Sequence, residues 1–374
     1  MTPRRRLIGL GLLAVLALAA VSVAVARPSG PARARRLTLN ELAGQRIVYA
    51  YAGLRPPAAL LSAIRAGEAG GVIFFGPNVA SAGQIRGVIA ELQRASLASP
   101  LHRRLLMLTD QEGGEVRRLP GPPALSEKQI GARSRGAGLA RLAGAGAART
   151  LSGAGMNVNL APVLDIYRTP GNFIDEYQRS YSSRPARVSA LAAAFIAAQQ
   201  QHGVAATAKH FPGLGAAAVN QNTDLRPVTL TVPAGTLRSV DEAPYRQAIA
   251  AGVKLVMTSW AVYPALDPRL PAGLSPAIIQ GELRGRLGFR GVTITDGIDA
   301  GAVTPYGNLA TRSVKAAAAG ADLILCAAVD PARNSPTIGL QAMHAIAAAI
   351  AHRRISRPSA EQAAARILAL RARP

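Results

Sequence analysis

Short apolar segments recur eight times along this chain of 374 residues, and Ala-rich stretches with helical spacing separate most of them. Segments of this length, often rich in Val, Ile and Leu, predict strands that are buried on both faces. They are 46–51, 71–75, 105–110, 156–160, 205–210, 255–260, 292–296 and 322–326. The repeated order of strand and helix predicts a parallel sheet covered by helices. Eight such units in about 340 residues favour an α/β fold of the (β/α)8 TIM-barrel type over an open sheet.

Helical spacing of apolar residues predicts the covering helices. The clearest helical segments are 185–202, 243–251, 311–320, 339–352 and 359–371. The last two follow the eighth predicted strand directly, and nothing in their pattern indicates a second domain. We therefore expect residues 39–374 to form one barrel domain.

The N-terminal residues have the pattern of an export signal. Arg4, Arg5 and Arg6 precede an apolar run, 7–26, which ends in Ala-Val-Ala. This pattern predicts a secretory signal peptide over residues 1–26, followed by a basic linker over 27–38. The apolar run is also long enough for an uncleaved anchor, which would tether the protein to the membrane. Either alternative predicts an exported protein that acts outside the cytoplasm.

Composition excludes several other classes of protein. The single cysteine, Cys326, excludes an intramolecular disulfide, and its apolar neighbours predict a buried side chain. The net charge is +23, but the arginines are dispersed, aromatics are few, and no nucleic-acid-binding motif is present. The five histidines lack the spacing of metal ligands, so we expect neither a metal nor a cofactor. The sequence does not indicate an oligomeric state.

Polar residues stand where the predicted strands end. Asp110, Asp165, Lys209 with His210, and Asp296 each follow or close an apolar run. The active sites of TIM barrels lie at the carboxyl ends of the strands, so these side chains are expected to meet at one mouth. After Lys209 and His210 the chain continues as Phe-Pro-Gly-Leu-Gly, which predicts a tight, shaped loop.

Each of these residues also has a plainer interpretation. Asp296 is a candidate nucleophile or general base, but an aspartate there can also cap the following helix, a role open to Asp299 as well. Asp110 opens the segment Asp-Gln-Glu-Gly-Gly, whose paired glycines suggest a backbone pressed against a ligand, although a plain turn would look similar. Asp165 is expected to be structural, holding the loop that follows it.

Four motifs in this order carry a resemblance to a known family. They are Asp-Gln-Glu-Gly-Gly at 110–114, Ala-Pro-Val-Leu-Asp at 161–165, Lys-His-Phe-Pro-Gly at 209–213, and Gly-Phe-Arg-Gly-Val-Thr-Ile-Thr-Asp at 288–296. From about residue 39 to 370, the sequence resembles family 3 glycoside hydrolases of the single-domain type similar to bacterial β-N-acetylhexosaminidases. The resemblance implies a carbohydrate substrate and a retaining mechanism, in which one carboxylate attacks the anomeric carbon and a second group transfers protons.

The resemblance also implies roles for individual residues. Asp296 matches the nucleophile of the family. The residues that match those holding the sugar hydroxyls are Asp110, Arg118, Arg179, Lys209 and His210. Cations and carboxylates suit that role because they form directional, charge-assisted hydrogen bonds.

The loop after Lys209 and His210 departs from the pattern of the hexosaminidase branch, in which an Asp-Ser-His triplet supplies the acid/base. Here the segment 216–224 reads Ala-Ala-Ala-Val-Asn-Gln-Asn-Thr-Asp and contains no histidine. Without gaps the triplet aligns with 220–222, which carries no proton-transfer group. With two extra loop residues it aligns with 222–224, which makes Asp224 the candidate acid/base. A solvated turn aspartate is the alternative.

Three further departures lie near the expected site. Trp260 replaces a histidine that relatives usually carry, Gly297 replaces an acidic residue, and Glu115 replaces an arginine. Trp260 could stack on a sugar or anchor the core. Three hypotheses remain open: a glycosidase that uses Asp296 and Asp224, a carbohydrate-binding pseudoenzyme without the acid/base, and a glycosidase that needs an activated leaving group or another acceptor such as phosphate.

Overall fold

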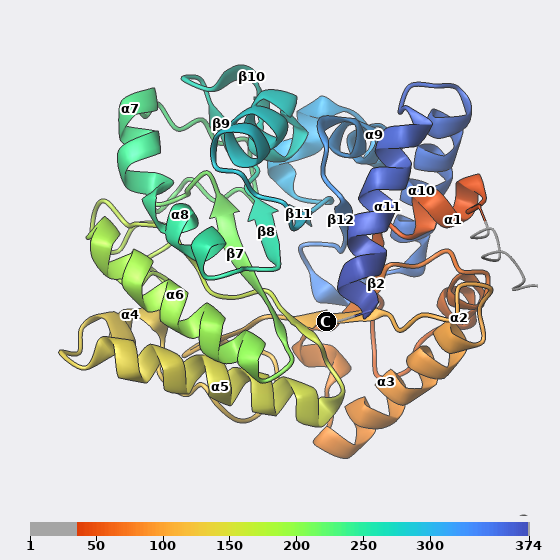
Figure 1. Ribbon diagram of the computed structural model, residues 1–374, viewed down its shortest axis with the longest axis horizontal. Coiled ribbons are helices and arrows are strands. Elements are labelled where there is room, and N and C mark those ends of the chain that lie inside the picture. Colours follow the sequence, from red (N-terminus) through yellow and green to blue (C-terminus); the bar gives the residue numbers. More distant parts are fainter. Residues whose placement is uncertain (1–35, 373–374) are drawn as a thin grey trace, which may run out of the picture. The chain divides into compact units, whose positions relative to one another are not determined.

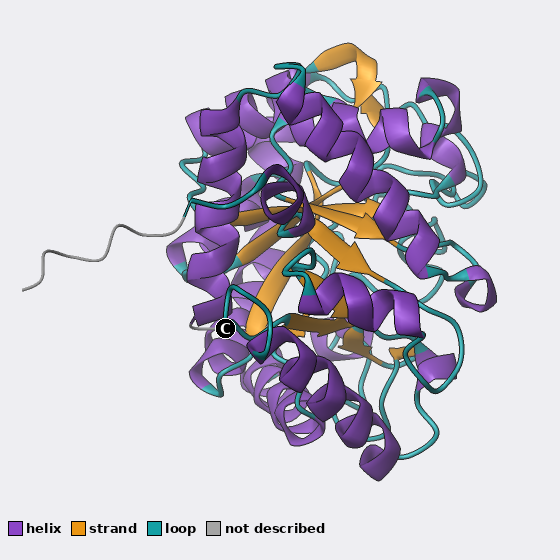
Figure 2. Cartoon of the chain, turned by 90° about the vertical axis from the view of Figure 1, so that its right-hand side faces the viewer, coloured by secondary structure: helices purple, strands orange, loops and turns teal. Residues whose placement is uncertain are grey.

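A computed structural model describes residues 36–372, which form an eight-stranded parallel barrel surrounded by helices (Figures 1 and 2). The closed order of the strands is β1-β12-β11-β8-β7-β6-β3-β2. The barrel strands are β1 (Ile47–Tyr49), β2 (Gly71–Ile73), β3 (Leu106–Thr109), β6 (Val158–Asn159), β7 (Ala205–Phe211), β8 (Leu255–Thr258), β11 (Val292–Gly297) and β12 (Leu323–Cys326). Each coincides with one of the eight predicted segments, which β7 and β11 exceed by one residue at their ends, so the predicted TIM barrel is confirmed.

Helices cover the outside of the barrel. They are α1 (Leu39–Gly44), α2 (Ala58–Arg65), α3 (Ala82–Leu97), α4 (Glu127–Gly131), α5 (Gly136–Ala154), α6 (Pro185–Gln201), α7 (Ala234–Thr236), α8 (Ala243–Ala250), α9 (Leu309–Ala319), α10 (Pro336–Ala351) and α11 (Arg357–Ala372). The five predicted helices correspond to α6, α8, α9, α10 and α11. Side-chain caps start several of them; Ser81, for example, accepts a hydrogen bond from the Gln84 backbone at the start of α3.

Shorter elements lie in the connections between the barrel strands. Two small hairpins, β4 (Gln111–Gly113) with β5 (Val116–Arg117) and β9 (Val262–Tyr263) with β10 (Asp267–Pro271), follow β3 and β8. A helical segment, η4 (Ala277–Arg286), precedes β11, and a short one, η5 (Gly301–Tyr306), follows it. The β4–β5 hairpin lies at the carboxyl end of β3, where the predicted site should be.

The interior of the barrel is a packed apolar core. One cluster of buried residues takes members from all eight barrel strands, among them Val48, Leu108 and Ile294. Two residues of α11, Ile367 and Leu370, belong to the same cluster. This helix therefore covers the amino-terminal end of the barrel, which leaves the opposite end free for a site.

Several predictions concern the chain outside this barrel. The predicted signal segment, 1–26, and most of the basic linker, 27–38, lie outside the described residues, so their boundaries stay predictions. Within residues 36–372, no helix is both long and apolar enough to cross a membrane. Cys326 is buried and free, as predicted.

Candidate active site

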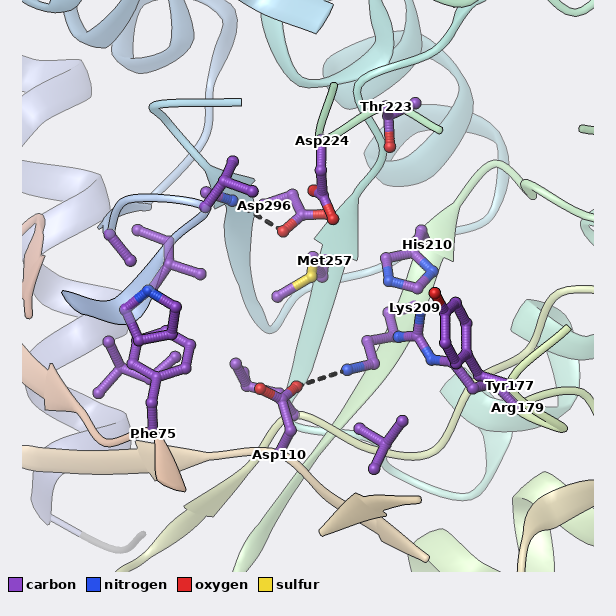
Figure 3. Close-up of a pocket in the computed structure, with 18 of the residues that line it drawn as sticks. Phe75, Asp110, Tyr177, Arg179, Lys209, His210, Thr223, Asp224, Met257 and Asp296 are labelled. Carbon is purple, nitrogen blue, oxygen red and sulfur yellow. Dashed lines mark hydrogen bonds and ion pairs between the residues drawn. The ribbon is translucent and has the colours of Figure 1, made fainter. Parts of the chain in front are cut away.

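A cavity of about 630 Å³ lies at the carboxyl ends of the barrel strands. Its lining includes every predicted site residue: Asp110, Arg118, Arg179, Lys209, His210, Asp224 and Asp296. These residues come from β7, β11 and the loops after β3, β6 and β7. The barrel thus brings together side chains that are far apart in the sequence, such as Asp110 and Asp296, which are separated by 186 positions. Figure 3 shows most of them around one space.

A network of four charged residues lies on one side of this cavity, and three of them, Asp110, Arg179 and Lys209, line it. The Lys209 ammonium lies 2.8 Å from Asp110 Oδ1 and 2.7 Å from Glu112 Oε1. Arg179 donates through Nε and Nη2 to both oxygens of Glu112, each at 2.9 Å. Lys209 and Glu112 are only 2% and 1% exposed. Such paired, buried charges hold each other in fixed positions, which suits a site that must orient a polar ligand.

The pKa values in the network follow from these pairs. Burial alone would raise the pKa of Asp110, but the Lys209 ammonium and the Arg118 guanidinium outweigh burial, so the pKa falls below its ordinary value. Burial likewise opposes ionisation of Glu112, yet Arg179 and Lys209 lower its pKa to about 2. Both carboxyls are therefore ionised near neutral pH. Asp110 lines the cavity and is available as an acceptor for hydroxyl groups, while Lys209 and Arg179 are available as donors. Glu112 does not line the cavity, and both of its oxygens already pair with Arg179 or Lys209.

Glu112 was not among the predicted site residues, although it lies in one of the four motifs. We expect Glu112→Gln to lower the free energy of unfolding by roughly 2 kcal/mol, because it removes the charged partner of two buried cations. Urea unfolding measures this loss. Glu115→Gln, an exposed substitution three residues along the chain, is the matched control. An unchanged free energy in Glu112→Gln would contradict the network.

Asp165 holds His210 and the loop that follows β7. Its Oδ2 lies 2.7 Å from His210 Nδ1, and its Oδ1 accepts a hydrogen bond from the Leu214 backbone at 2.6 Å. Asp165 is fully buried and does not line the cavity. Asp165 therefore has a structural role, as predicted. Its carboxylate orients the loop after β7, however, and not the loop directly after Asp165.

The tight loop predicted after His210 is also present. Gly213 has φ of +147°, and a Cβ at Gly215 would collide with the Ile166 carbonyl. Glycine is required at both positions, because one backbone conformation disfavours side chains and one close approach excludes them. Farther along the same connection, residues 222–224 line the cavity.

Asp296 and Asp224 face each other across the upper part of the cavity (Figure 3). Asp296 stands near the end of β11 and accepts a hydrogen bond from the Gly297 backbone at 2.7 Å. It caps no helix, since η5 begins only at Gly301 with Ala300 before it. The alternative helix-capping role is therefore wrong, and the Asp296 side chain lines the cavity.

Asp224 comes from the long loop after β7. As a whole the residue is exposed, but its carboxyl points into the cavity toward Asp296 and His210 (Figure 3). Partial burial, and then the neighbouring Asp296 carboxylate, raise the pKa of Asp224 to about 6. The loop is fixed by a hydrogen bond from Gly301 N to Asp224 O, at 2.7 Å. A carboxyl group with this pKa can both donate and accept a proton near neutral pH.

The packing around the cavity decides between the alternatives for Trp260 and for the paired glycines. Trp260 is 1% exposed and donates its indole N–H to the Gly297 carbonyl at 2.8 Å. It does not line the cavity, so it is a core anchor and not a stacking platform for a sugar. The paired glycines, Gly113 and Gly114, do not line it either. A Cβ on Gly113 would collide with Leu125, and one on Gly114 would collide with Ser126. The two glycines therefore allow another segment of the chain to pack against them, and the expectation that a ligand lies there was wrong.

The apolar part of the lining was not predicted. Phe75, Phe173, Tyr177 and Met257 contribute rings and a thioether to the walls. Phe75 is the last residue of a predicted strand. The sequence cannot show whether an apolar residue at that position lines the site or packs in the core. The cavity thus combines a charged side with an apolar side, as ligand pockets commonly do.

Comparisons with known proteins show the family of this chain. The model of the glycosyl hydrolase family 3 N-terminal domain matches residues 38–370. A secreted glycosyl hydrolase of uncharacterised activity from Arthroderma benhamiae is 44% identical over 333 residues, 88% of this chain and 92% of that protein. A β-hexosaminidase from Thioalkalivibrio sulfidiphilus is 35% identical over 265 residues, 69% of this chain and 73% of its own.

A solved structure of a family 3 enzyme has the same fold as this chain. The family 3 β-N-acetylglucosaminidase from Paenibacillus sp. superposes with a TM-score of 0.84 at 35% identity, over 90% of this chain. This chain spans 63% of the length of that protein. Fold, motifs and relatives lead to one conclusion: this chain is a glycoside hydrolase and belongs to family 3.

Proposed function

We propose that this protein is an exported, retaining β-glycosidase with the specificity of a β-N-acetylhexosaminidase, acting on terminal β-linked sugars of envelope or environmental glycans. The observation that carries the proposal is the facing pair Asp296 and Asp224 beside a fixed set of charged hydrogen-bonding groups. A retaining mechanism needs two such groups, one to attack and one to transfer protons.

In the first step the Asp296 carboxylate attacks the anomeric carbon and forms a covalent glycosyl ester. At the same time the protonated Asp224 carboxyl gives its proton to the glycosidic oxygen, and the aglycone leaves as an alcohol. In the second step ionised Asp224 takes a proton from water, which attacks the same carbon and releases Asp296. The pKa of about 6 at Asp224 supports both roles of this residue.

The charged network would hold the sugar while this happens. Asp110, Lys209 and His210 lie together on one side of the cavity, where they suit the hydroxyl groups of a single ring. Arg179 and Arg118 extend the same set of donors. The packed barrel core closes the cavity from beneath, so a glycan can enter it only from the open mouth of the barrel.

Two further lines support the substrate and the location. β-Hexosaminidases recur among the curated relatives, and the Paenibacillus structure is a β-N-acetylglucosaminidase. The predicted signal segment over residues 1–26 supports export, as does the relative from Arthroderma benhamiae, which is named a secreted protein.

A panel of nitrophenyl glycosides tests the proposal. We expect the purified protein to hydrolyse the N-acetyl-β-glucosaminide with kcat/KM at least about tenfold above that for the β-glucoside and the β-xyloside, since the Paenibacillus structure is named a β-N-acetylglucosaminidase. Release of nitrophenol measures the rates. The anomeric form of the first product, followed by NMR, separates retention from inversion.

The missing histidine motivates a second candidate, a carbohydrate-binding pseudoenzyme. It would bind N-acetylglucosamine without turning over any member of the panel. A rate that rises when phosphate is added would instead indicate phosphate as the acceptor in the second step.

A further inference from the structure

A second cavity, of about 500 Å³, lies at the opposite end of the barrel. It is bounded by η4, the end of α9, α11 and the residues that precede β1, β11 and β12. Of these elements, Figure 1 labels α9, α11, β11 and β12, which lie in the right-hand part of its upper half. The cavity shares no lining residue with the candidate active site, and its size is that of a small-molecule pocket.

Positive charge dominates the lining of this cavity. It contains four arginines, Arg46, Arg284, Arg290 and Arg366, against one acidic residue, Asp322. Asp322 pairs with Arg284 at 2.6 Å and with Arg366 at 2.8 Å. Among the described residues, neither Arg46 nor Arg290 forms an ion pair with a carboxylate. The cavity therefore holds more positive charge than its own protein groups neutralise.

Arg46 is the most deeply buried of the four arginines. It is 1% exposed, and its Nη2 donates to the carbonyls of Ala317 and Ala321 at 2.9 and 2.6 Å. Its Nη1 is buried and has no hydrogen-bond partner among residues 36–372, and the same is true of Arg284 Nε. A buried, charged N–H group without an acceptor is costly, so these two nitrogens add to the unbalanced positive charge beside the cavity.

The guanidinium groups also disfavour one another. Burial, and after it the charge of Arg366, act against protonation of Arg46 and lower its pKa to about 10, although Asp322 opposes the shift. Burial lowers the pKa of Arg284 as well, despite its ion pair with Asp322. An anion in the cavity would relieve both effects, because its negative charge would offset the repulsion between the guanidinium groups.

We propose that this cavity binds a phosphate group, either as free phosphate or as the phosphate of an organic ester. Planar guanidinium groups match the oxygens of phosphate in paired, charge-assisted hydrogen bonds, and several arginines around one cavity are the arrangement that phosphate recognition uses. Ser359, Gln280 and Gln362 supply neutral donors in the same lining. The volume exceeds that of phosphate alone, which leaves space for the organic part of an ester. The site is independent of the glycosidase activity.

Calorimetric titration of the purified protein tests the proposal, with sodium phosphate and with glucose 6-phosphate as probes at constant ionic strength. We expect saturable binding of one equivalent. Arg290→Gln and Arg366→Gln should each weaken binding about tenfold, the size of one charge-assisted hydrogen bond. Arg290 is exposed and makes no side-chain hydrogen bond among the described residues, so Arg290→Gln should fold normally, as a thermal melt verifies.

Arg141→Gln is the matched control, since it removes the same charge from the exposed surface of α5, away from the cavity. Binding of free phosphate as tight as that of the ester supports a site for the anion itself, and tighter binding of the ester supports a site for a larger phosphorylated molecule. The proposal is overturned if neither probe binds, or if both cavity variants bind as well as the wild type. Loss of binding in Arg118→Gln alone would also overturn it, since that would locate the anion in the active-site cavity.

Discussion

Asp296→Ala is expected to lower kcat/KM by at least about four orders of magnitude, because a retaining glycosidase without its nucleophile cannot form the covalent intermediate. The measurement is the release of nitrophenol from the N-acetyl-β-glucosaminide, with enough enzyme to detect slow turnover. The side chain makes one short hydrogen bond, to the next residue in the chain, so its removal should leave the fold intact.

Asp299→Ala is the matched control for this experiment, because it removes a carboxylate three residues along the same loop that does not line the cavity. It should retain most of the activity. If Asp296→Ala turned over as fast as the control, Asp296 would not be the nucleophile and the assignment of the whole site would fail.

Asp224→Ala is expected to slow hydrolysis by a factor of about 10² to 10⁴ for alkyl glycosides, which need a proton on the leaving oxygen. Dinitrophenyl glycosides have a leaving group that needs no acid, so their first step should be nearly unaffected. The second step still lacks its base, and the glycosyl ester on Asp296 should accumulate. Mass spectrometry of the quenched protein would detect it as one added sugar.

The pH profile gives an independent measure of Asp224. Because its pKa is about 6 and the acid form must donate the proton, the first step with alkyl glycosides should be fast below pH 6 and should fall as pH rises above it. Asp224→Ala and Asp224→Asn should both lack this fall. Equal slowing of alkyl and dinitrophenyl glycosides in both steps, with the pH profile unchanged, would show that Asp224 serves only the structure of the loop.

The barrel and the position of the site could be predicted because both follow from local signals. Apolar runs of β-formers give the strands, and polar residues at their ends, such as Asp110 and Asp296, reveal the mouth. Their partners could not be predicted in the same way. Glu112 bridges Lys209 and Arg179 only because loops from distant parts of the chain meet there.

Two other places in the chain show why spacing alone was not enough. Asp224 had two possible alignments in its loop, and only the folded loop directs it toward Asp296. Gly113 and Gly114 did signal a close approach, but a sequence cannot say whether a ligand or another segment of the chain fills the space beside them. In each case the missing information was the path of a loop.

Trp260 gives this protein a built-in optical probe. It is the only tryptophan in the chain, and its indole N–H is bonded to the carbonyl of Gly297, directly after Asp296. Emission excited at the red edge of tryptophan absorption therefore comes from a single, water-shielded ring attached to the loop of the proposed nucleophile. A stopped-flow trace of that emission can time sugar binding and ester formation without any label.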